Sequence, residues 1–366
     1  MLSFRSRRDW LWLPAVLVAV LVATPASSAA QPQAAPPKVD KKQQEKQNKE
    51  TKAEVETLVK LIDAAQKELP VPADLAIGWH NDFMKAQQGR IYVPFTLTID
   101  QTALTTRSVS MYIRVVAKTP PPPPADPAAK ETASKDKPVQ TAPPVWPFED
   151  IHLFEFKEAA KGQPYKVSRA FAVPSGDYDV YIALHERKSG KNQVAKATAL
   201  KQSLTLPDYW NGQLTTSSVI LADSVEPRPS APSPQEQIEK PYLIGNTEIT
   251  PASDNRFTRS EELSIIFMIY NPALKEKKPD VTVDYKFHQK AADGTEKYFN
   301  RTSPTVLNAT TLPPQFDFDL GHQLVAGQSV PLASFPEGDY RLEIEIVDNL
   351  AQKKMTRELL FTVAGS

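Results

Sequence analysis

Apolar residues recur at every second position along much of the chain after residue 90. Residues 91–99, 109–115 and 281–287 alternate apolar and polar or small side chains in this way, whereas residues 263–270 are apolar at nearly every position. A period of two sends successive side chains to opposite faces, so the alternating runs predict strands with one buried face. The continuous run predicts a central strand. Strands do not alternate with helices, and this predicts a mainly β chain built from sandwich domains.

A different spacing comes before the strands. Between residues 53 and 69, apolar side chains recur every three or four positions, and Pro70 follows. This spacing predicts one amphipathic helix at 53–69 that the proline ends. The first interpretation is that its apolar face docks on the next domain. The alternative is weak self-association as a short coiled coil, although the pattern covers barely two heptads.

Proline-rich and polar stretches predict the domain boundaries. Residues 31–52 contain almost no large apolar residue and predict a disordered tether. A run of five prolines opens residues 119–147, which we expect to be a disordered insertion within the first domain. A second proline-rich stretch at 227–241 predicts a linker. The expected domains are therefore two β-sandwiches at 73–226 and 242–366.

An internal repeat supports two similar domains. Pro174–Ile182 (PSGDYDVYI) recurs as Pro336–Ile344 (PEGDYRLEI), and each copy opens a long alternating strand. A tyrosine after a tight turn near the last hairpin is similar to a feature of immunoglobulin-like and fibronectin-type sandwiches. Asp177 and Asp339 could bind calcium or serve as turn residues. The spacing of a calcium loop is missing, and this favours the turn interpretation.

The first thirty residues predict export. Three arginines precede an apolar run of about 14 residues, and small residues follow it up to Ala30. This is typical of a secretory signal peptide (1–30) cleaved between Ala30 and Gln31. The alternative is an uncleaved anchor, but about 20 apolar residues are needed to span a bilayer. We expect a periplasmic or extracellular protein that meets the membrane only during export.

Composition excludes several functions. The 366 residues include 43 basic and 43 acidic side chains, which argues against a nucleic-acid partner. There is no cysteine, so disulfides, thiol catalysis and thiolate metal sites are absent. The five histidines lack metal-ligand spacing, and no nucleophile elbow or phosphate loop occurs. The sequence therefore predicts no enzyme, cofactor or metal site.

Two pairs of residues remain as candidates for ligand contact. Tyr209 and Trp210 lie in a turn-like segment and could stack on a sugar, although packing against the domain is the favoured interpretation. Asp317 and Asp319 alternate with phenylalanines. On a strand they would share one face about 7 Å apart, a separation found for glycosidase acids, but an outward face of an edge strand is the favoured interpretation.

Four segments carry a resemblance to a known group. They are Gly78–Asp82 (GWHND), Tyr92–Thr96 (YVPFT), Leu214–Val225 and Pro336–Val363. In these segments the chain resembles exported bacterial proteins, abundant in Acidobacteria, with von Willebrand-A-related or GWxTD-like β-sandwich regions of unknown function. Asn81 stands where that motif has threonine. The Asp-x-Ser-x-Ser metal loop of von Willebrand domains is missing, so metal-dependent adhesion is not implied.

The function expected from these observations is non-enzymatic. We expect a structural or protein-interaction role in the cell envelope, with a protein or glycan partner. The first alternative is a carbohydrate-binding module or a carbohydrate-active accessory protein. The second is an accessory or inhibitory domain of a secreted protease system.

Overall fold

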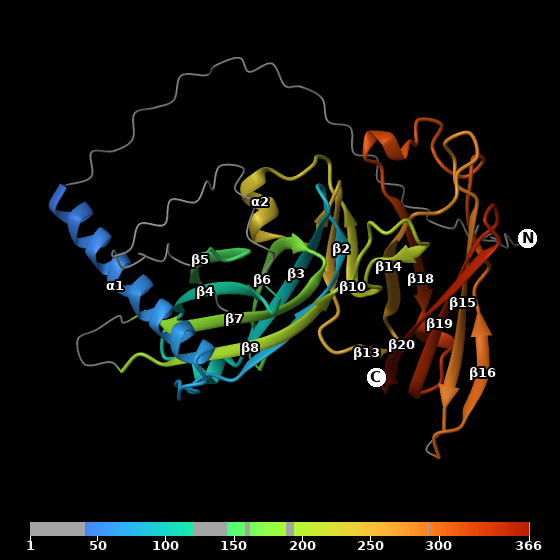
Figure 1. The fold of residues 1–366 in the computed structure, drawn as a ribbon. Coiled ribbons are helices and arrows are strands. Elements are labelled where there is room, and N and C mark those ends of the chain that lie inside the picture. The colour runs from blue at the N-terminus through green and yellow to red at the C-terminus, as the bar shows by residue number, and fades with distance from the viewer. Residues whose placement is uncertain (1–40, 120–144, 158–161, 188–193, 292, 366) are drawn as a thin grey trace, which may run out of the picture. The chain divides into compact units, whose positions relative to one another are not determined.

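The computed structural model describes residues 41–119, 145–157, 162–187, 194–291 and 293–365. Within these ranges the chain forms 20 β-strands, two α-helices and three short 3-10 helices, so it is mainly β, as the sequence predicts (Figure 1). It divides into two compact units between Trp210 and Asn211. No helix among the described residues is long and apolar enough to cross a membrane. The expected signal peptide, its cleavage site and most of the insertion lie outside these residues.

The first unit is a sandwich of two four-stranded antiparallel sheets. In one sheet, β3 is the central strand and pairs with β1, β2 and β6. The other sheet has the strand order β5-β4-β7-β8. Alternate apolar side chains of β3 and β4 are fully buried, as the period of two predicts. The strands are β1 (Ile77–Asn81), β2 (Met84–Lys85), β3 (Arg90–Ile99), β4 (Ser108–Ala117), β5 (Phe148–Glu155), β6 (Tyr165–Pro174), β7 (Gly176–Glu186) and β8 (Ala197–Leu206), with a 3-10 turn η1 (Gln101–Ala103).

Helix α1 (Lys41–Gln66) covers the outer face of the sheet β5-β4-β7-β8. Leu58 and Ile62 are fully buried in a cluster with Tyr112 and Tyr181 of the sheet. The docking interpretation is therefore confirmed. Because this apolar face is covered within the chain, it does not offer the surface that the coiled-coil alternative requires.

The boundaries predicted for this helix were wrong at both ends. Residues 41–52, expected to be part of a tether, are helical. Lysine, glutamine and glutamate favour helix even where no apolar stripe marks one. The helix ends at Gln66 rather than 69, because Glu68 adopts a left-handed φ of 56° and the Leu69 amide turns back to the Ala64 carbonyl.

The second unit is also a sandwich, of two six-stranded sheets. One has the order β11-β12-β10-β14-β18 with β9 beside β14, and the other has the order β13-β20-β19-β15-β16 with β17 beside β15. A single apolar core fills the space between the sheets. The strands are β9 (Thr215–Thr216), β10 (Ile220–Pro227), β11 (Leu243–Ile244), β12 (Thr247–Pro251), β13 (Arg256–Thr258), β14 (Glu262–Tyr270), β15 (Val281–Lys290), β16 (Glu296–Arg301), β17 (Thr305–Leu307), β18 (Leu324–Pro331), β19 (Gly338–Asp348) and β20 (Lys353–Ala364).

The expected linker is not a linker. β10 ends at Pro227 and pairs with β12 and β14, so this part of the predicted first domain belongs to the second sandwich. Residues 234–239 form the short helix α2 (Pro234–Glu239), capped by Ser233 and begun by a proline. The proline-rich stretch is a connection within the second domain and not a linker between domains. Proline is favoured in the first turn of a helix as well as in an extended linker, so composition alone does not distinguish the two.

The repeat predicted from the sequence corresponds to β7 and β19. Gly176 and Gly338 open these strands with φ values of 142° and 140°, in the region that favours glycine. The next residues, Asp177 and Asp339, each accept a hydrogen bond from a threonine on the adjacent strand, at 2.6 and 2.7 Å. These aspartates thus hold the start of a hairpin through a cross-strand bond.

The two repeated strands also end alike, a similarity that was not predicted from the sequence. Each closes ten residues after its glycine on a buried acid, Glu186 in β7 and Asp348 in β19. Glu186 accepts backbone N–H groups of Thr105, Thr106 and Lys196, at 2.5–3.2 Å. Asp348 accepts those of Ala273, Leu350 and Ala351, at 2.7–3.0 Å. In both sandwiches, a buried carboxylate thereby links the backbones of two connecting loops at one end of the domain.

Candidate functional site

The segment with Tyr209 and Trp210 is mostly packed. Tyr209 is buried, and its hydroxyl donates to the Phe83 carbonyl at 3.3 Å. Trp210 is 46% exposed, but the Lys85 Nζ lies 4.1 Å from its ring centroid. Burial lowers the pKa of Lys85, with Asp208 acting in the opposite direction. The two rings therefore do not form an open stacking platform.

Asp317 and Asp319 do not lie on a strand, which corrects that prediction. Asp319 lies in the 3-10 turn η2 (Phe318–Leu320), and Asp317 caps its start, where its carboxylate accepts the Asp319 amide at 2.8 Å. The Lys277 ammonium lies 3.5 Å from Asp317 and 2.9 Å from Asp319. Hydrogen bonding to the Asp319 amide is the main cause that lowers the pKa of Asp317. Both carboxylates are engaged in holding a loop, and the geometry is not that of a pair of hydrolase acids.

One trio has the residue types of a hydrolytic site. His185 on β7 lies 2.7 Å from the Glu54 carboxylate of α1, and Ser110 is its cross-strand partner on β4. The Ser110 hydroxyl, however, is fully buried and has no hydrogen-bond partner. A nucleophile needs both a bond to its base and access to substrate. We therefore assign this trio to the docking of α1.

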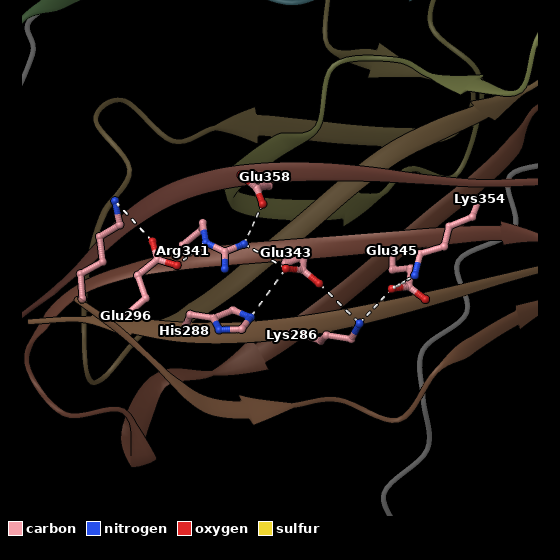
Figure 2. Close-up of polar contacts among 9 residues, drawn as sticks. Lys286, His288, Glu296, Arg341, Glu343, Glu345, Lys354 and Glu358 are labelled. Carbon is pink, nitrogen blue, oxygen red and sulfur yellow. Dashed lines mark hydrogen bonds and ion pairs between the residues drawn. The ribbon is translucent and has the colours of Figure 1, made fainter. Parts of the chain in front are cut away.

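The outer face of the sheet β16-β15-β19-β20 carries a continuous network of ion pairs, the ladder (Figure 2). Four cations and four carboxylates alternate with the core residues of these strands. Arg341 lies at the centre, with its guanidinium 2.7–3.0 Å from three glutamates. The members are Lys286, Lys290, Arg341, Lys354, Glu296, Glu343, Glu345 and Glu358, together with His288.

The ladder balances its own charge. Hydrogen bonds from Arg341 lower the pKa of Glu296 and of Glu343, and one from Lys354 lowers the pKa of Glu345. Hydrogen bonding to Glu345 raises the pKa of Lys286. With four lysine or arginine side chains and four glutamates, the ladder has no net charge apart from His288. It is therefore unsuited to attracting a polyanion or a polycation over distance.

Two exposed hydrophobic side chains flank this network in one cross-strand row. The register aligns Tyr298, His288, Arg341 and Leu360 on the four successive strands. Tyr298 and Leu360 are 54% and 56% exposed at the two ends of the row, while the Arg341 side chain is only 16% exposed between them. Tyrosine and arginine are enriched among the residues that dominate the energetics of protein interfaces. This row is the candidate site.

Removing the centre of the ladder tests its contribution to stability. Arg341→Ala is expected to lower the free energy of unfolding by about 1 kcal/mol at pH 7, because three partly exposed pairs are lost. Since the pKa values of Glu296 and Glu343 are depressed in the folded state, their contribution is present above about pH 4.3 and disappears as pH falls below it.

The measurement is urea unfolding at pH 7 and pH 3, with Lys297→Ala as the control. The Lys297 side chain makes no ion pair within the described residues, so its loss should be nearly neutral at both pH values. An Arg341 effect that persists undiminished at pH 3 would show that packing rather than charge pairing carries it.

A surface depression with a volume of about 460 Å³ lies in the first sandwich. Asp100, Gln101 and Gln163 supply its polar lining, beside Ile77 and Pro164. Asp100 already accepts the Thr102 amide and hydroxyl, which lower the pKa of its carboxyl. Across the described residues, no group of three histidine or acidic side chains is placed to hold a metal ion.

The row was not predicted from the sequence. Its signal is present, because Tyr298 and Leu360 occupy positions of amphipathic strands where a polar residue is expected. Each has an apolar neighbour in sequence, Phe299 and Leu359, and from the sequence either member of the pair could face the core. The register settles which one faces outward.

Comparisons with known proteins give little further guidance. No family model matches the chain, and no curated protein matches it. Among solved structures, it is similar to trypsin-activated alpha-2-macroglobulin from Escherichia coli, with 10% identity and a TM-score of 0.22. The match covers 81% of this chain and 17% of that structure, so the chain spans about a sixth of its length. This similarity is too low to transfer a function.

Proposed function

We propose that this chain is a non-enzymatic, exported protein that binds a protein partner in the cell envelope through the outer face of its second sandwich. The charge and apolar patterning of residues 1–30 supports export. The cross-strand row with exposed Tyr298 and Leu360 supports partner binding, and it is the observation on which the proposal rests.

The row has the make-up of a protein interface. The rings and methyl groups at its ends provide apolar area, and burying them would contribute about 25 cal/mol for each Å² removed from water. Between these two ends, Arg341 and its three glutamates form a polar surface. Their mutual hydrogen bonds hold the side chains in fixed orientations before a partner binds. Because the ladder is neutral, we expect binding to depend weakly on salt, in contrast to binding steered by a charged patch.

The test compares the protein with the double variant Tyr298→Ser/Leu360→Ser. Each is used as bait with the envelope fraction of the source cells, and the captured protein is then titrated directly. We expect affinity to fall at least about tenfold, since interface hot spots are worth about 2 kcal/mol or more. The matched control is Ile238→Ser, which changes another half-exposed apolar residue, on α2, and should leave affinity intact. Equal binding by all three proteins would overturn this assignment of the site.

Carbohydrate binding stays the alternative, and a glycan array run in parallel addresses it. The buried position of Tyr209 removes one ring of the expected platform, which leaves Trp210 as the ring to test. Glycan retention that disappears in Trp210→Ala, with no protein partner captured through the row, would favour the alternative.

A further inference from the structure

The second sandwich has three exposed leucines on the connections at one of its ends, which we call the loop end. Leu274 lies in the connection from β14 to β15, Leu320 in the connection that leads to β18, and Leu350 between β19 and β20. The register pairs Val281 with Asp348 and Ile269 with Leu324, so these connections meet at the same end of the sandwich (Figure 1). Leu320 is 68% exposed and Leu274 is 49% exposed.

The loop end is held rigidly. The buried Asp348 carboxylate accepts the Leu350 amide and the amide of Ala273, next to Leu274. Lys277 binds Asp319, next to Leu320, and Lys278 donates to the carbonyls of Pro314 and Phe316. The three connections that carry the leucines are therefore held in place by these bonds before any partner binds. Such preorganisation reduces the entropy lost on binding.

A strained turn projects from this end. Lys275 and Lys278 exchange backbone hydrogen bonds of 2.9 and 3.0 Å, closing a two-residue turn. Both central residues, Glu276 and Lys277, have positive φ values of 53° and 63°. Turns of this shape favour asparagine and glycine, so these two side chains are kept at a conformational cost. Strain of this kind is most often retained where the side chains are used.

The turn presents two adjacent, opposite charges. Lys275 and Glu276 are exposed, and within the described residues the side chain of neither has an ion-pair or hydrogen-bond partner. Lys277, by contrast, binds two aspartates of its own sandwich. The loop end thus combines exposed leucines with a cation and an anion, Lys275 and Glu276, that are adjacent in the turn and make no side-chain bond within the described residues.

We propose that the loop end binds a second copy of this chain about a twofold axis. The three leucines of each copy pack together, and Lys275 of each copy pairs with Glu276 of the other. A twofold contact requires a self-complementary surface, and neighbouring opposite charges at the same end as exposed leucines satisfy this requirement. The sheet face with Tyr298 and Leu360 takes no part, so the dimer is compatible with the proposed partner site.

A charge-reversal cycle tests the pairing directly. The association of the full-length mature chain is measured by sedimentation velocity over a range of concentrations. Lys275→Glu sets like charges against each other in both pairs and is expected to weaken the dimer at least about tenfold. The double variant Lys275→Glu/Glu276→Lys restores opposite charges, and its dimer constant should return to within about threefold of the original.

Two further variants complete the experiment. Leu320→Asp should abolish the dimer, whereas Lys297→Glu, a charge reversal on the exposed strand β16, should leave it unchanged. Circular dichroism checks that each variant is folded, and all these positions are exposed. A protein that is monomeric at every concentration overturns the proposal. A dimer that weakens equally in the single and double reversals overturns the reciprocal pairing.

Discussion

Replacement of Glu186 by alanine is expected to lower the free energy of unfolding of the first sandwich by about 3–5 kcal/mol. The carboxylate is 1% exposed and accepts three backbone N–H groups and the Thr105 hydroxyl. Alanine would leave these donors buried without an acceptor, and such orphaned donors cost about 1–3 kcal/mol each before water enters. The measurement is guanidinium unfolding followed by circular dichroism.

The matched variants are Glu186→Gln and Glu155→Ala. Glutamine keeps the size of the side chain but points an NH₂ group at backbone donors, so it should recover only part of the loss. Glu155 lies exposed at the end of the edge strand β5, and its replacement should be nearly neutral. If Glu186→Ala lowers the free energy of unfolding by less than about 1 kcal/mol, water replaces the carboxylate as the hydrogen-bond acceptor. The buried acid would then not be needed to hold the two connecting loops together.

The same side chain gives a pH dependence with a defined sign. Burial raises the pKa of Glu186, but hydrogen bonds from Thr105, Lys196 and Thr106 outweigh it, so its folded-state pKa lies below the ordinary value. A depressed pKa stabilises the fold above the unfolded value of about 4.3 and ceases to do so as pH falls through the folded value. The difference in stability between the protein and Glu186→Gln should therefore shrink below about pH 4.3.

Shortening both Leu58 and Ile62 to alanine is the second change with a large expected effect. Both side chains are fully buried between α1 and the sheet, and each truncation of this kind costs about 2–5 kcal/mol. The polar contacts of the helix, which include His185 with Glu54 and Arg114 with Asp63 and Gln66, cannot offset that loss. We expect α1 to detach while the sandwich stays folded.

Hydrogen exchange over residues 53–66 is the measurement, with Lys60→Ala on the exposed side of the helix as the control. Amides of α1 should lose their protection in the double variant and keep it in the control. If protection is unchanged, docking depends on the polar contacts rather than on the apolar face. If the whole first sandwich also exchanges, the helix is an integral layer of that domain.

The sequence predicted the strands well wherever one face is buried. The alternation in β3 and β15 follows directly from burial on a single side, and the structure confirms it. β4 was expected to have a polar outer face, but Tyr112 and Arg114 are buried there because α1 covers them. The periodicity of the sequence alone could not predict that these two residues are buried. It indicates which face of a strand is apolar, but not what packs against the other face.

Boundaries and sites were predicted less well, for two reasons. Proline content at 227–241 suggested a linker, but pairing between distant strands places β10 and α2 in the second sandwich. The candidate row depends on register across four strands, and the loop end depends on three connections that meet only in the folded chain. Both arrangements are long-range, and neither leaves a local pattern of the kind that identified the repeat.

The pairing of β4 with β5 has a practical consequence for engineering. Val115 and Phe148 are cross-strand partners, so the two ends of the chain between them are already held together by the sheet. For a connection closed in this way, each doubling in length costs only about 0.6 kcal/mol of closure entropy. A fluorescent reporter or an affinity tag could therefore be spliced between these strands, with no residue of the row or of the loop end replaced.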